Sequence, residues 1–183
     1  MSKSIITLLD KALLPAAVMI FGKFIGVAIT LRLFNLPWTV GQVANSVFSN
    51  GNIIRAEDLK TVISYSDLIM YIIVALGMVI ILIRAIYLHN SHVKPSLVAR
   101  LANYNLLSLI RDSYDVYHSA AVWLIFTWVA NTIVIINGIS GQSFSWVAIV
   151  ATLVSIVATL ILFQDIYKEI ENIKRKPSDY QWV

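Results

Sequence analysis

Lys23 is the residue in this sequence with the clearest potential for chemistry, because it lies well inside a long apolar run. It is about eleven positions into the run 12–34, which places it roughly 16 Å along a helix and close to a bilayer midplane. A lysine at that depth costs about 2.5–3.5 kcal/mol on insertion scales, and intramembrane charges usually mark functional sites. The sequence therefore predicts a specific environment for this ammonium group.

Four environments for Lys23 remain open from the sequence. A neighbouring subunit could supply an acid, or a polar cavity could bring an anion, a proton or a solute to the ammonium. The amine could also be neutral and held by side-chain oxygens. Finally, the side chain could reach toward the headgroups from a helix that is shifted in the membrane.

No carboxylate lies inside any of the four apolar runs, since Asp67 stands at the very start of the second. The nearest ones, Asp67 and Asp165, are predicted to lie at opposite ends of the bundle. The sequence therefore argues against an ion pair within the chain at the midplane, and a partner's acid stays one of the four environments open to Lys23.

Polar residues occur at a depth similar to that of Lys23 on two other helices. Thr127 and Asn131 are four apart on the third run, and Ser155 and Thr159 are four apart on the fourth. Such pairs share a helix face, so they could form a polar seam with Lys23. The simpler alternative is ordinary interhelical hydrogen bonding, worth about 0.6 kcal/mol per bond.

Gly22 and Gly26 form a G-x-x-x-G pair beside Lys23. Small residues four apart let two helix backbones approach closely, either within a bundle or between chains. Next to an unpaired lysine, this spacing predicts that the first helix is an assembly face.

The three histidines, His89, His92 and His118, map to the cytoplasmic ends of the second and third runs. Histidine is a common metal ligand, but the spacing matches no metal or haem motif. Motifs of nucleotide-binding enzymes, hydrolases and metalloproteases are absent, and so is cysteine. We therefore expect a non-enzymatic protein with no metal and no cofactor.

Composition explains where these residues must sit. Of 183 residues, 58% are hydrophobic and only 13% are charged, against about 25% charged in a soluble domain. Continuous apolar runs near 20 residues indicate transmembrane helices rather than the alternating strands of a barrel. We expect one all-α domain over 1–183, an integral membrane bundle. Its predicted parts are four spans and a cytoplasmic tail: 12–34, 67–88, 118–136, 144–163 and 164–183.

The connections add further expectations. The polar segment 137–142 predicts a tight turn and an antiparallel hairpin of the last two helices. Helical periodicity in 40–48 and 95–117 predicts a short interfacial helix in each of the first and second loops. The fourth helix is expected to continue as far as Arg175. Trp146 is expected at the outer membrane interface, where tryptophan anchors helices.

Lysine and arginine counts set the predicted orientation. The two sides differ strongly, with only Arg55 and Lys60 on the outer side. The other side holds Lys3, Lys11, Lys94, Arg100, Arg111, Lys168, Lys174, Arg175 and Lys176. The positive-inside rule places both termini in the cytoplasm, and we expect the plasma membrane of a bacterium. Loop charges of this kind account for the net charge of +4 without nucleic acid.

Two functions follow as expectations. The first is a membrane subunit or scaffold that assembles with a membrane protein partner, or with copies of itself, through the Gly22 and Gly26 face. The second is a small transporter or channel with a polar seam around Lys23.

Overall fold

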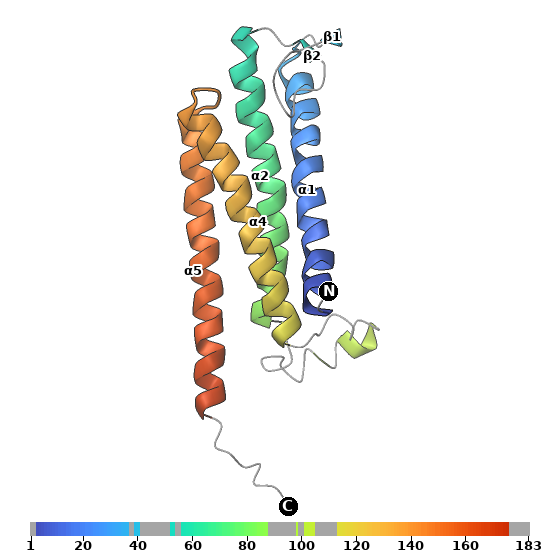
Figure 1. Cartoon of the computed structure of the whole chain (residues 1–183), viewed down its shortest axis with the longest axis vertical. Coiled ribbons are helices and arrows are strands. Elements are labelled where there is room, and N and C mark those ends of the chain that lie inside the picture. The colour runs from blue at the N-terminus through green and yellow to red at the C-terminus, as the bar shows by residue number, and fades with distance from the viewer. Residues whose placement is uncertain are drawn as a thin grey trace, which may run out of the picture.

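The computed structural model describes residues 3–36, 39–40, 52–53, 56–87, 98, 101–104 and 113–175. Four long helices dominate these residues: α1 (Lys3–Leu33), α2 (Ala56–Tyr87), α4 (Ser113–Ile139) and α5 (Ser145–Arg175). Each is long and apolar enough to cross a membrane, as predicted (Figure 1). Two short strands, β1 (Thr39–Val40) and β2 (Asn52–Ile53), pair antiparallel between α1 and α2.

The helix starts differ from the prediction. α1 begins at Lys3, and α2 begins at Ala56, eleven residues before the predicted start at Asp67. Hydropathy alone places the start of the second span at Asp67, the last charged residue before a long apolar run. Glutamate and lysine are good helix formers, however, so the polar segment before that run continues the same helix. Asp67 therefore lies inside the candidate membrane span Asp58–Tyr87.

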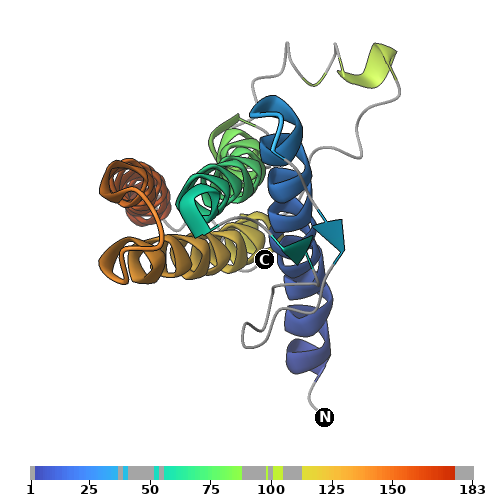
Figure 2. The same ribbon diagram turned by 90° about the horizontal axis from the view of Figure 1, so that it is seen from above.

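The helices form an open arrangement with α2 and α4 at its centre (Figures 1 and 2). α1 packs against α2 and α4 on one side, and α5 packs against the same two helices on the other. Among the described residues, α1 and α5 do not contact each other. The start of α1 and the end of α5 lie at the same end of the bundle (Figure 1).

The predicted hairpin is confirmed. α4 and α5 run antiparallel and are joined by a tight turn in which Gln142 N–H and Ser143 N–H both donate to Asn137 O at 3.0 Å. Gly141 has a φ of 73°, a left-handed conformation that glycine adopts without steric cost. The predicted continuation of the fourth helix to Arg175 is also confirmed.

The two predicted interfacial helices are not tested by this structure. The segment 41–48 lies outside the described residues. Of the segment 95–117, only 98, 101–104 and 113–117 are described.

The apolar core joins three of the four helices. One buried cluster comprises Met70, Tyr71, Val74, Ala130, Val134, Val147 and Ala151. A second comprises Met78, Leu82, Ala120, Trp123, Ala158 and Leu162. All of these residues belong to α2, α4 and α5, whereas α1 adds only partly buried side chains, Val18 and Met19, that pack against the clusters.

α1 packs on α2 through its two glycines. A Cβ atom on Gly26 would lie 2.7 Å from Ser66 O and 2.9 Å from Ser66 Cα, and a Cβ on Gly22 would lie 3.4 Å from Met70 Cα. The G-x-x-x-G face is therefore occupied by α2 of the same chain. Of the two contacts that this spacing allows, the structure shows the one within the bundle, and binding of another subunit through this face stays a prediction.

These contacts predict different costs for two similar substitutions. Gly26→Ala should destabilise the fold by about 1–3 kcal/mol, because the new methyl group overlaps backbone atoms that cannot move independently. Gly22→Ala is the matched control, since its methyl group meets Met70 Cα at a tolerable distance. Thermal unfolding in mild detergent measures both variants. Equal Tm values for the two would contradict the described packing.

Candidate functional site

Lys23 is paired inside the chain. Its Nζ donates hydrogen bonds to Asp67 Oδ1 and, at 2.8 Å, to Ser66 Oγ, both on α2. The prediction that no internal ion pair forms is therefore wrong. The error arises from the predicted start of the second helix. The sequence predicts Asp67 at the end of that helix, whereas it lies three turns inside α2.

The two charges meet because α1 and α2 run antiparallel. Lys23 lies ten residues before the end of α1, or about 15 Å at 1.5 Å per residue. Asp67 lies eleven residues after the start of α2, or about 16 Å. Counting back from the connection between the two helices would have found this match, given the true start of α2.

The second oxygen of Asp67 is also bonded. Asn137 Nδ2, in the last turn of α4, donates to Asp67 Oδ2 at 2.7 Å. The network thus joins α1, α2 and α4. Asp67 is 0% exposed, and the Lys23 side chain is 23% exposed. A charge buried this deeply is tolerated only when it is paired and hydrogen-bonded, as both oxygens of this carboxylate are.

The predicted polar seam is not assembled around Lys23. Thr127 Oγ1 donates to Trp123 O of its own helix at 2.9 Å. Asn131 Oδ1 accepts from Thr152 Oγ1 at 3.2 Å. These hydroxyl and amide groups make short local bonds rather than one continuous chain.

The fourth helix shows the same pattern. Ser155 Oγ lies 2.8 Å from Tyr71 OH, which also donates to Ala151 O at 2.7 Å. Thr159 Oγ1 accepts from Trp128 Nε1 at 3.0 Å. The sequence reasoning missed Tyr71 because a tyrosine in an apolar run carries no signal of which hydroxyl it will meet.

A second ion pair fixes α1 near the other end of the bundle. Lys11 Nζ lies 2.9 Å from Asp115 Oδ1 on α4. Nearby, Tyr117 OH donates to Asp165 Oδ2 at 2.9 Å and links α4 to α5. Asp165 is therefore bonded far from Lys23, as the sequence placed it.

The residues considered for a metal site are only partly described. His118 lies on α4, whereas His89 and His92 lie outside the described residues. Within the described part of the chain, no three histidine or acidic side chains form a group that could hold a metal ion.

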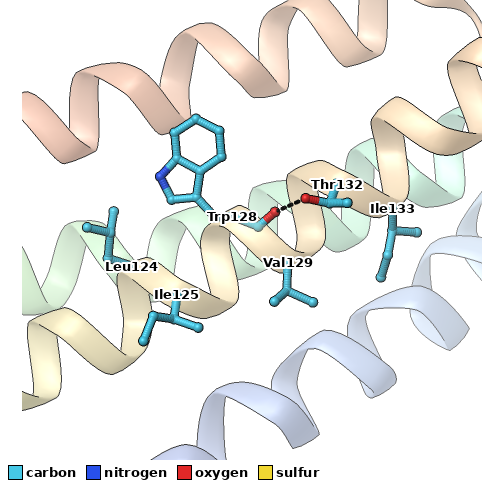
Figure 3. Close-up of a pocket in the computed structure, with 6 residues that line it drawn as sticks. All are labelled: Leu124, Ile125, Trp128, Val129, Thr132 and Ile133. Atoms are coloured by element: carbon cyan, nitrogen blue, oxygen red, sulfur yellow. Dashed lines mark hydrogen bonds between the residues drawn. The ribbon is translucent and has the colours of Figure 1, made fainter.

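The outer face of α4 carries a shallow apolar groove of about 430 Å³. Six α4 residues line it: Leu124, Ile125, Trp128, Val129, Thr132 and Ile133. Figure 3 shows Trp128 pointing toward α5 while Ile125 and Val129 point to the opposite side. The Thr132 hydroxyl donates to Trp128 O at 2.8 Å, so the groove surface is apolar in character.

A double-mutant cycle tests the ion pair. Lys23→Met and Asp67→Leu should each destabilise the protein by about 3–5 kcal/mol, because each leaves one buried charge without its partner. The double variant should lose much less than the sum of the two. Lys168→Met, at an exposed position, is the control and should change stability by about 0.5 kcal/mol or less. Additive losses in detergent unfolding would contradict a direct pairing.

Comparison of the chain with protein-family models, with curated proteins and with solved structures gives no match. What this protein does is therefore inferred from its own contacts and surfaces.

Proposed function

We propose that this chain is a non-enzymatic integral membrane protein that acts as a subunit or scaffold of a larger membrane assembly. Four helices of membrane-spanning length and hydropathy support insertion into a bilayer. The start of α1, with Lys3 and Lys11, and the end of α5, with Lys168, Lys174 and Arg175, lie at the same end of the bundle. This distribution supports a cytoplasmic location for both termini and the plasma membrane of a bacterium.

The observation that carries this proposal is the open outer face of α4. α1 and α5 lie on either side of the α2–α4 pair and do not touch among the described residues. The exposed positions of α4 follow helical spacing and form one stripe: Ala121, Ile125, Val129, Thr132 and Ile136. Helices in lipid associate through close packing, and a stripe of small and β-branched residues beside a groove suits a further helix.

The internal ion pairs also bear on how a partner would bind. Lys23 is neutralised by Asp67, and Lys11 by Asp115, within the same chain. A partner therefore need not supply an acid to the first helix. The contact that we propose is apolar and lies on the outer face of α4 rather than on the Gly22 and Gly26 face of α1.

Cysteine crosslinking tests this contact directly, because the chain contains no cysteine of its own. Val129→Cys introduces a thiol in the α4 groove, and Val157→Cys introduces one on the exposed face of α5. Crosslinking in native membranes should join Val129→Cys to one discrete product, whose mass identifies a partner or a second copy. The α5 control should give none.

Native mass in mild detergent provides a second readout of the same proposal. A complex of defined stoichiometry should co-purify with the chain. A monomer that crosslinks at neither position, or equally at both, would rule out a subunit that docks through α4.

A second candidate function is a small transporter or channel. The supporting observation is the Lys23–Asp67 pair inside two candidate membrane spans, with Lys23 still partly exposed. Ionisable residues at such positions often lie on ion or proton pathways.

The Lys23→Met/Asp67→Leu double variant separates the two functions. It removes both charges together, so neither is left buried without its partner, and the fold and the α4 contact should survive. Transport predicts that ion flux into proteoliposomes occurs with the parent protein and is lost in the double variant. A subunit predicts no flux from either protein and unchanged crosslinking at Val129→Cys.

A further inference from the structure

We infer that the first turn of α5, together with Lys60 of α2, binds the phosphate group of a lipid headgroup. The site lies at the end of the bundle that holds the α4–α5 turn. It is distinct from the groove on α4 and borders the Lys23 network, since Ser143 N–H donates to Asn137 O at 3.0 Å.

Free backbone amides form the first part of this site. α5 begins at Ser145 and runs for 31 residues. Val147 N–H donates to Phe144 O at 3.0 Å, but the N–H groups of Ser145 and Trp146 have no acceptor among the described residues. The N-terminus of a long helix carries a partial positive charge, and its free amides suit the oxygens of a phosphate.

Lys60 brings a full positive charge next to Phe144, the residue that immediately precedes the start of α5. Its Nζ lies over the aromatic ring of Phe144, 5.4 Å from the ring centroid. Lys60 is exposed and has no carboxylate partner among the described residues.

Ser143 supplies an independent sign of a missing ligand. The residue is 2% exposed, and its buried hydroxyl oxygen has no hydrogen-bond partner among the described residues. The next residue is held firmly, since Phe144 N–H donates to Ser64 Oγ at 2.8 Å. A buried hydroxyl without a partner is unfavourable, and a phosphate oxygen bound at this turn would give it an acceptor.

Aromatic and apolar neighbours identify the phosphate as part of a lipid. The rings of Trp146 and Tyr65 lie 6.5 Å apart between centroids, and those of Tyr65 and Phe34 lie 4.9 Å apart. Such rings favour the headgroup level of a membrane. Directly beyond Trp146, α5 exposes Ile149 and Leu153, which would lie along the acyl chains.

Lipid-dependent stability of the full chain tests this site. The protein is purified in uncharged detergent and titrated with phosphatidylglycerol, with phosphatidylcholine, and with inorganic phosphate in separate arms. Phosphatidylglycerol should raise the Tm most and should remain bound in native mass spectrometry. Lys60→Gln should weaken the apparent lipid affinity about fivefold, the expectation for one basic residue near an anionic surface. Lys168→Gln, near the other end of α5, should not change it.

Ser143→Ala gives a second, opposite signature. Without lipid it should be at least as stable as the parent, because it removes an unpaired buried hydroxyl, yet its gain from phosphatidylglycerol should be smaller. Equal protection by inorganic phosphate would overturn the assignment to lipid. No preference for the anionic lipid, or equal losses in Lys60→Gln and Lys168→Gln, would overturn the site itself.

Discussion

The pairing of Lys23 with Asp67 is the constraint on which the arrangement of the helices depends. A one-residue slip of α1 along α2 would move the ammonium by about 1.5 Å and turn it by about 100°, which would leave both charges unpaired in apolar surroundings. Gly26 packs on Ser66, the neighbour of Asp67, so the same register is required by close backbone contact. Asn137 extends the constraint to α4 through the second carboxylate oxygen.

The two outer helices are held by different interactions. α1 packs only partly buried side chains, Val18 and Met19, against the two apolar clusters, and it is also held by glycine contacts and by ion pairs through Lys11 and Lys23. α5 instead presents a buried stripe at three- and four-residue spacing, which includes Val147, Ala151 and Ala158. Loss of charge should therefore affect α1 far more than α5, whereas a change of side-chain volume should have the reverse effect.

The sequence predicted those features that depend on local pattern. The four helices, the turn at 137–142 and the continuation of α5 to Arg175 follow from hydropathy, turn residues and helical periodicity. The ion pair was missed because it depends on where α2 begins, and no hydropathy boundary marks Ala56. The proposed seam failed because a threonine in a helix can donate to the carbonyl four residues earlier, as Thr127 and Thr159 do. The groove on α4 depends on how α1 and α5 cross the central pair, which no local pattern encodes.

The separation of the paired charges along the chain also has a consequence for how the protein is made. Asp67 follows Lys23 by 44 residues. At roughly 5–20 residues per second, the lysine is synthesised about 2–9 s before its counter-ion exists. During that interval the first helix carries an unneutralised ammonium and enters lipid only at a cost. The first two helices should therefore leave the insertion machinery together, as one unit, rather than in succession.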